Sequence, residues 1–406
     1  MYGHEFRNNT VLQWALGALV FVYFIVFEGW VRSSIFTKEA FDSFRYVCPP
    51  HFQSCGDLYI FQALPQGYSQ TILYMVFFAI LTWSAYLISK KEWDTVQLSL
   101  VPIFVWHAAH TVIFTDLTAG NYEYYIIAFG LVLLFFPHKE FFLKLILVMF
   151  YVLSTISKIY PSWIEGGYFS ALKTGLPLFP DWSIPIWTNV VMVMEMVGAW
   201  FLMSSNRVLQ RTVLVFFILF HLYSGILVEY RYPATVLPFI LIAFGPWYRF
   251  TKVPLDKKSL FGWSFVLLLL ILQFSPKFIE GDEKMTAEGN KYGLYMFEAN
   301  HQCFSEAKIY FKDGTVREDN FYRNLARNRC EPYQPWFKYK QLCTRTEEIE
   351  KIEWQFNHSL NGGPFYRIVD TKNVCELEYK AFEHNSWIIQ ATEAKNVGYP
   401  VKNLYY

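Results

Sequence analysis

The stretch "ISKIYPSWIEGG", residues 156–167, places Lys158 at the end of an apolar run, just before a turn that contains proline and glycine. A lysine held in a partly desolvated cleft can lose its proton and act as a base. A lysine that only reaches from the end of a membrane span to the headgroup region keeps its charge. Both interpretations fit the residue types, and they differ in what must surround Lys158.

Other ionisable side chains lie inside apolar runs: Glu195 in "VMVMEMVGAW", His221 in "LFHLYSG", and His107 and His110 in "HAAH". Such groups are costly at membrane depth and usually face a bundle interior or a wet cavity. Glu195 is expected either to form a hydrogen bond between helices, with His221 as one partner, or to handle a proton. The two histidines of "HAAH" share a helix face, but no carboxylate or thiolate lies close to them in the sequence. We therefore expect no metal site.

The composition indicates a membrane protein. Of the 406 residues, 54% are hydrophobic and only 17% are charged, whereas soluble proteins have about 25% charged residues. The formal net charge of +1 gives no reason to expect a nucleic-acid partner. No Walker loop, G-x-G-x-x-G run, G-x-S-x-G elbow or H-E-x-x-H pair is present in the sequence. The expected partner is the lipid bilayer.

The first 275 residues contain nine apolar runs, each near the length that crosses a hydrocarbon core of about 30 Å. We therefore expect a polytopic α-helical membrane protein with about nine spans, whose transmembrane helical domain is residues 1–275. The runs are residues 11–31, 70–89, 97–115, 122–137, 141–159, 186–203, 209–229, 233–247 and 260–275.

Loop charges predict the orientation of these spans. With nine spans, the loops on one side are short and rich in lysine and arginine, and the positive-inside rule assigns that side to the cytoplasm. The N-terminus is then cytoplasmic and the C-terminal domain extracytoplasmic, at the plasma or inner membrane of a bacterium or in the endoplasmic reticulum of a eukaryote. The basic residues on the cytoplasmic side are Arg7, Lys90, Lys91, Lys139, Lys144, Arg207, Arg211, Arg249, Lys252, Lys257 and Lys258.

All six cysteines lie outside the apolar runs and on the side that the charges make extracytoplasmic, where disulfides persist. An even number of cysteines there favours up to three bridges, with fifteen possible connectivities. Metal ligation is the alternative, but the close spacing typical of zinc sites is missing. The disulfide candidates are Cys48, Cys55, Cys303, Cys330, Cys343 and Cys375.

Residues 283–406 change to short alternating runs and predict an extracytoplasmic α+β domain. "EAKIYFKDGTVREDNF" is typical of a hairpin that turns at Asp313-Gly314. "PWFKYKQLCTRTEEIEKI" has helical spacing, and "IEWQFNHSL", "PFYRIVDT" and "CELEYKAF" are predicted strands, with a turn at residues 361–363. "NHS" at 357–359 fits the N-glycosylation sequon, which matters only in a eukaryotic cell.

The segment around Lys158 resembles a motif of the vitamin K-dependent γ-glutamyl carboxylases and of bacterial relatives that share their transmembrane (HTTM-type) domain. The matching residues are Lys158, Ile159, Trp163, Ile164, Glu165 and Gly166. "NYEYYIIAFGLVLLFFP", "VMEMVGAWFL" and "LFHLYSGILV" are similar to three further spans of that family. "AKIYFKDGT", "IEWQFNHSLNGGPFYRIVDT" and "FEHNSWIIQ" resemble its strand-rich part, in the same order, so that the resemblance covers most of the chain.

The resemblance implies an enzyme in which Lys158 deprotonates a reduced naphthoquinone. In that family, O2 then converts the quinol into an alkoxide base, which removes a γ-proton from a peptide glutamate that captures CO2. The cofactor is then a vitamin K-type hydroquinone, with O2 and CO2 as co-substrates, and the partner is a peptide or protein substrate. The resemblance gives supporting roles to Asn121, Tyr122, Trp163, Glu165, Glu195 and His221.

The chain departs from the carboxylases at two places. Tyr122 follows Asn121 where they have a histidine, and a tyrosine cannot be a cation near neutral pH. The stretch "LYMFEANHQC" stands where they have a Trp-Arg-Met type sequence, and we expect no counterpart of the further C-terminal region that engages their peptide substrates. The alternative is a non-catalytic membrane partner in the maturation or export of a secreted peptide or protein. A transporter is less expected, because no inverted repeat is visible.

Overall fold

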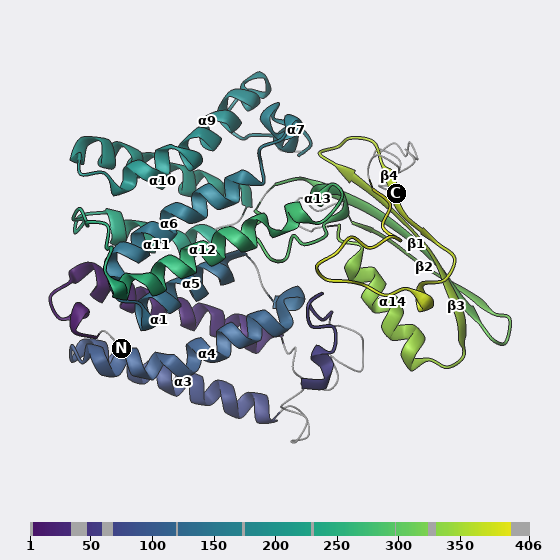
Figure 1. Ribbon diagram of the computed structural model, residues 1–406, viewed down its shortest axis with the longest axis horizontal. Helices are drawn as coiled ribbons and strands as arrows, with labels where there is room; N and C mark the ends of the chain where they lie inside the picture. The colour runs from purple at the N-terminus through teal and green to yellow at the C-terminus, as the bar shows by residue number, and fades with distance from the viewer. Residues whose placement is uncertain are drawn as a thin grey trace. The chain divides into compact units, whose positions relative to one another are not determined.

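The computed structural model is helical over most of the chain and contains, in its C-terminal part, a sheet that carries one helix (Figure 1). It describes residues 3–33, 47–58, 68–118, 121–172, 175–228, 231–296, 298–323 and 330–390. Contacts divide the chain into two compact units, each described by itself below. The helical unit is Met1–Pro49, Ser54–Leu153 and Val193–Leu270, and the sheet unit is Pro50–Gln53, Ser154–Met192 and Ile271–Tyr406.

Each of the nine predicted apolar runs coincides with a helix. Apolar side chains favour this outcome, because in hydrocarbon only a helix or a closed barrel satisfies its own backbone groups. The helices are α1 (Thr10–Ser33), α3 (Tyr68–Ser89), α4 (Trp93–Thr118), α5 (Asn121–Phe135), α6 (Lys139–Ile156), α9 (Ile184–Met196), α10 (Arg207–Val228), α11 (Arg231–Phe244) and α12 (Leu260–Phe274).

Five of these segments are long and apolar enough to cross a membrane: Thr10–Phe27, Ile72–Ser89, Trp93–Ile113, Arg207–Leu227 and Lys257–Phe278. Two shorter apolar helices, Glu123–Phe135 and Pro233–Phe244, accompany them. The prediction of a helical membrane protein is therefore confirmed at the level of five candidate spans.

Helix α6 lies in the core of the helical unit. Its residues from Phe141 to Leu153 are all buried except Val152. Phe142 packs edge-on against Phe136 and Trp263, with ring centroids 5.5 and 5.7 Å away. Gly262 of α12 lies over the Phe142 ring, and a Cβ there would be 2.2 Å from it. This close approach requires a glycine at position 262.

The sheet unit contains four antiparallel strands in the order β2-β1-β3-β4. The strands are β1 (His301–Phe311), β2 (Val316–Arg323), β3 (Ile349–Leu360) and β4 (Tyr366–Thr371). Helix α14 (Tyr333–Arg345) covers one face of this sheet (Figure 1). Tyr339 of α14 packs edge-on against Trp354 of β3, which is fully buried. The predicted α+β region is thereby confirmed.

Both predicted turns are present. Gly314, between β1 and β2, has a φ of 84°, and Asn361 and Gly362, after β3, have φ values of 51° and 72°. The prediction of a strand in "CELEYKAF" is wrong, because residues 374–376 form a short helical turn, η8 (Val374–Glu376). The Asn373 side chain accepts a hydrogen bond from Cys375 N at 3.2 Å, and this local cap competes with strand pairing.

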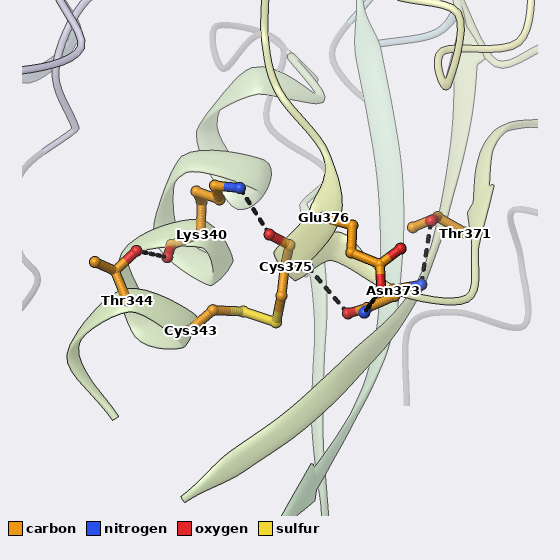
Figure 2. Close-up of a disulfide and its surroundings, with 7 residues drawn as sticks. All are labelled: Lys340, Cys343, Thr344, Thr371, Asn373, Cys375 and Glu376. Atoms are coloured by element: carbon orange, nitrogen blue, oxygen red, sulfur yellow. Dashed lines mark hydrogen bonds between the residues drawn. A yellow bond between two sulfur atoms is a disulfide. The ribbon is translucent and has the colours of Figure 1, made fainter. Parts of the chain in front are cut away.

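The three predicted disulfides are present, and their connectivity is Cys48–Cys55, Cys303–Cys330 and Cys343–Cys375. All six cysteines are thereby paired. Figure 2 shows the third bridge, which joins α14 to η8. Beside it, Lys340 Nζ donates to Cys375 O at 2.7 Å. A disulfide-bonded C-terminal region is consistent with an extracytoplasmic location.

The sequon at residues 357–359 lies inside β3. Asn357, His358 and Ser359 are all fully buried, so that the fold has no room for an oligosaccharide on Asn357.

Short helical turns complete the described structure: η1 (Gly3–Phe6), η2 (Cys55–Leu58), α7 (Pro161–Ile164), α8 (Gly167–Ser170), η4 (Asp181–Ser183), η5 (Gly198–Met203), η6 (Lys257–Ser259), η7 (Ser275–Phe278) and α13 (Glu283–Thr286).

Candidate functional site

Lys158 lies two residues after the end of α6, within the sheet unit. Its backbone N–H donates to Thr155 O at 2.9 Å, and this bond closes the last turn of the helix. The residue is only 5% exposed, and its Nζ lies 5.7 Å from the centroid of the Trp163 ring. The side-chain nitrogen therefore lies over an aromatic face and inside the protein.

The chain after Lys158 folds back through two short helices, α7 and α8. Gly166 joins them with a φ of 82°, and a Cβ there would lie 2.8 Å from Ile184 Cγ2. Both the positive φ and the close approach require glycine. The turn brings Trp163 into a buried cluster with Tyr168 and Met192. The packing of Trp163 and the backbone conformation of Gly166 therefore explain why these residue types occur in the motif.

Hydrogen bonds attach this segment to the residues that flank β1 and β3. Tyr160 OH donates to Glu298 O at 2.5 Å. The side-chain amide of Asn361 donates to Tyr160 OH at 2.9 Å and to Ser162 Oγ at 3.0 Å. Asn361 also exchanges hydrogen bonds with Asn300, as Asn300 N donates to Asn361 Oδ1 and Asn361 N donates to Asn300 O. We call this set of bonds the Asn361 clamp.

The hydroxyl of Tyr160 remains a protonated donor in this clamp. Burial raises the pKa of Tyr160 above its ordinary value, and the hydrogen bond from Asn361 opposes that shift. Lys284 Nζ of α13 lies 4.7 Å from the centroid of the Tyr160 ring. The aromatic residue next to the candidate base is thus fixed by contacts at its hydroxyl and at its ring.

For Glu165, Asn121 and Tyr122, the structure shows no contact with Lys158 among the described side chains. Glu165 is exposed, and among the described residues no ion pair with it is found. Glu165 therefore forms no ion pair with Lys158 in the described structure. Asn121 and Tyr122 are the first residues of α5, and their side chains lie outside the described part of the structure.

Glu195 and His221 are both buried in the helical unit, with 3% and 0% exposure. Glu195 lies on α9. His221 Nε2, on α10, contacts the hydroxyl of Tyr151 on α6. The contact gives His221 a role in joining α6 to α10.

The sequence interpretation missed a carboxylate beside "HAAH". His107 Nε2 contacts Glu123 Oε2, and both side chains are buried. The pair forms because α4 and α5 pack against each other, which brings together residues 16 apart in the chain. Tyr23 of α1 lies edge-on to His107, with ring centroids 5.7 Å apart. A carboxylate that is distant in the sequence is therefore adjacent to His107 in the fold.

A second feature that the sequence interpretation missed is a group of buried polar residues where β1 begins and β3 ends. The available signal was an interruption of the alternating pattern, because successive residues in "ANHQC" and "FNHSL" are polar. The group contains Glu298, Asn300, His301, Gln302, Asn357, His358 and Ser359, none of which is more than 4% exposed.

Comparisons of the chain with protein-family models, with curated proteins and with solved structures found no match. The fold and the site define a class only: a helical protein with candidate membrane spans and a disulfide-bonded α+β region. Any assignment beyond that class rests on the geometry above and on the motifs of the sequence.

Proposed function

We propose that the chain is an integral membrane enzyme that oxidises a lipid-soluble quinol, with Lys158 as the base. The observation that carries the proposal is the burial of the Lys158 amine beside an aromatic cluster. A lysine that only reaches for the headgroup region does not need this setting. A base that acts on a lipid-soluble substrate, in contrast, must lie inside the protein, in a place from which water is excluded.

The residues around Lys158 fit a flat aromatic quinol. Trp163 and Tyr168 are buried there, with Tyr160 and Phe169 packed against them. Aromatic faces of this kind suit stacking against a fused ring system. When bound, a reduced naphthoquinone would supply an acidic hydroxyl and the two electrons that O2 accepts.

The work of the protein is then to accept and hold a proton at Lys158 Nζ. The neutral amine takes the proton from the hydroxyl, and the ammonium that forms is stabilised over the Trp163 ring. The Asn361 clamp keeps the segment in place while the charge changes. With CO2 and a peptide glutamate the reaction would be a γ-carboxylation, as the resemblance to the carboxylases suggests.

The proposal includes the orientation and the span count. Nine crossings, with the N-terminus in the cytoplasm, place the sheet unit outside the cytoplasm and Lys158 at the outer end of α6. The host membrane is the plasma or inner membrane in a bacterium, or the endoplasmic reticulum in a eukaryote. The support is the loop charge and the pairing of all six cysteines.

The second candidate function is a non-catalytic partner in the maturation or export of a secreted peptide. One observation favours it: a groove of about 340 Å³ on the sheet, lined mainly by polar and charged side chains. Extended peptides can bind along sheets, where side chains select among them. The lining residues are Glu306, Lys308, Glu318, Asn320, Glu353, Trp354, Gln355, Asp370, Thr371 and Lys372.

The test is O2 uptake by the full chain in lipid nanodiscs with a reduced naphthoquinone. Lys158→Arg and Lys158→Ala should fold and be inactive, because a guanidinium, with a pKa above about 12, cannot shed its proton. Lys351→Arg, at a partly exposed ion pair on β3, is the matched control and should keep full activity. An active Lys158→Arg would contradict the base role. A wild type that is inactive with naphthoquinols but retains a secreted peptide would favour the second function.

A further inference from the structure

The loop between α11 and α12, residues 245–258, has a backbone that is fastened to the helical unit. Tyr248 is buried, and its hydroxyl donates to Ser204 O at 2.9 Å. Lys144 Nζ of α6, which is also buried, donates to Arg249 O at 2.7 Å. These bonds hold the middle of the loop against α6 and against the residues before α10.

The second half of the loop is held by α12. Trp263 Nε1 of α12 donates to Pro254 O at 2.9 Å. The Asp256 carboxylate accepts a hydrogen bond from Ser259 N at 2.8 Å and lies 3.0 Å from His138 Nε2. The one acidic residue of the loop is therefore already engaged by neighbouring protein groups.

This loop and the residues that begin α10 form a strongly cationic region. The Arg207 guanidinium lies over the Tyr248 ring, 5.0 Å from its centroid. Residues 204–211 and 245–258 together contain six basic residues and one acidic residue, Asp256. In the described part of the chain, none of the six forms an ion pair. All six are exposed: Arg207, Arg211, Arg249, Lys252, Lys257 and Lys258.

Large apolar side chains alternate with these cations along the loop. Trp247, Phe250, Val253 and Leu255 are all exposed, and Leu255 is 85% exposed. Because the loop backbone is fastened, these side chains are presented at defined places without a further loss of backbone entropy on binding. Exposed apolar groups gathered in this way mark a surface that contacts a partner or a membrane.

The position of the loop in the chain favours a membrane. Arg207 and Lys257 are the first residues of two candidate spans, Arg207–Leu227 and Lys257–Phe278. The loop therefore lies where hydrocarbon gives way to water. At this depth, apolar side chains meet the upper acyl chains and cationic side chains reach the phosphates.

We propose that residues 245–258, together with Arg207 and Arg211, form a binding surface for anionic phospholipid headgroups. Charge complementarity selects the anionic lipid, because a cluster of unpaired Lys and Arg side chains beside a membrane span attracts negatively charged headgroups. The proposal does not depend on the quinol chemistry proposed for Lys158. In the proposed orientation the surface faces the cytoplasmic leaflet, where anionic lipids are found.

The size of the preference can be estimated from the number of cations. Each Lys or Arg near an anionic membrane surface contributes roughly fivefold to the affinity. Salt weakens the attraction, because the Debye length falls from about 10 Å at 0.1 M to about 3 Å at 1 M ionic strength. The anionic lipid should therefore be held selectively at low salt and much less so at high salt.

The test is a count of the lipids that the full chain retains from mixed micelles. The micelles contain equal amounts of phosphatidylglycerol and phosphatidylcholine, and mass spectrometry counts the lipids after affinity purification. At about 0.1 M salt, the wild type should retain phosphatidylglycerol over phosphatidylcholine by about tenfold or more. The triple variant Arg207→Gln, Arg249→Gln, Lys252→Gln should retain both lipids in nearly the ratio of the mixture.

A matched triple variant in the sheet unit is the control. Lys308→Gln, Lys312→Gln and Lys372→Gln remove three charges from exposed side chains outside the loop, and this variant should keep the wild-type preference. Sodium phosphate should release no more phosphatidylglycerol than sodium chloride of the same ionic strength, because a free phosphate lacks the acyl chains that the apolar side chains contact.

Three results would overturn the surface. A wild type that retains both lipids in the ratio of the mixture would exclude the lipid and leave the loop to an acidic protein, and this result needs no variant to fold. A folded loop variant with the wild-type preference would place the lipid elsewhere. A larger release by phosphate than by chloride would assign the cations to a free phosphate.

Discussion

At the scale of single residues, Asn361 holds the Lys158 segment through both its side chain and its backbone. Its amide nitrogen donates to Tyr160 and Ser162, while its Oδ1 accepts from Asn300. Its φ of 51° lies in the left-handed region, which asparagine tolerates better than most residues other than glycine. The side-chain contacts and the backbone conformation therefore both favour asparagine at this position.

Replacing Asn361 should destabilise the sheet unit. Asn361→Ala removes the side-chain bonds of the clamp and places an alanine at a positive φ, and we expect a loss of about 2–4 kcal/mol in the free energy of unfolding. Asn361→Gly removes the same side-chain bonds but accepts the φ, so that its loss should be smaller. Urea unfolding in detergent micelles measures both. An Asn361→Ala variant as stable as the wild type would show that the clamp contributes nothing.

His358 gives the sheet unit a sensitivity to acid. Because burial lowers its pKa to about 3, the folded chain leaves His358 neutral at pH 5, while the unfolded chain protonates it below about pH 6.5. The folded state should therefore lose stability as the pH drops from about 6.5 towards 3. For this one proton, the equilibrium constant for folding should fall by about tenfold per pH unit. His358→Gln should reduce the slope of unfolding free energy against pH by one proton. An unchanged slope would contradict the neutral, buried state of His358.

At the scale of elements, the Cys343–Cys375 bridge fastens α14 to η8 (Figure 2). The bridge spans 32 residues, whereas Cys48–Cys55 spans only 7. Because a disulfide restricts the unfolded chain more when its loop is longer, Cys343→Ser with Cys375→Ser should cost about 4 kcal/mol. The pair Cys48→Ser and Cys55→Ser should cost about 2 kcal/mol. Unfolding midpoints of both double variants check the order, and equal losses would argue against the loop-length account.

The elements also show which parts of the fold a sequence can predict. Apolar runs of span length predicted the helices, because in hydrocarbon the backbone has no other way to satisfy its hydrogen bonds. Alternation predicted β1, β2, β3 and β4, because successive side chains of a strand face opposite sides. The stretch at residues 375–382 has the same alternation, but the Asn373 cap and the Cys375 bridge lead it into a turn instead.

The sequence did not predict which distant residues contact each other. Glu123 meets His107 only because α4 and α5 pack together. The cysteine connectivity was one of fifteen, and it depends on where α14 places Cys343. His301 and His358 meet through the register that sets Cys303 opposite His358. For Lys158, the sequence indicated the candidate residue, but its burial and the Asn361 clamp needed the fold.

At the scale of the whole molecule, the sidedness of the two ends depends only on whether the number of crossings is odd. In the described residues, five candidate spans precede the sheet-forming part of the chain, and the two shorter apolar helices would make seven. The proposed count is nine. Each of these numbers is odd, so that in every case the N-terminus and the C-terminal sheet lie on opposite faces. For the proposed nine crossings, the positive-inside rule would assign the sheet to the extracytoplasmic face.

Amine labelling of intact cells with a reagent that does not cross membranes can test this orientation with internal controls. The exposed Lys338 and Lys372 and the partly exposed Lys351 lie in the sheet unit, and the exposed Lys90 and Lys257 lie at helix ends assigned to the cytoplasm. We expect the first three to be labelled on intact cells and the other two only after permeabilisation, because the bilayer excludes the reagent. Labelling of Lys90 and Lys257 alone would reverse the orientation, and disulfides in the C-terminal region would then face a reducing compartment. Labelling of Lys90 together with Lys338 on intact cells would require an even number of crossings between them, so that at least one of the apolar helices from α4 to α12 would fail to span.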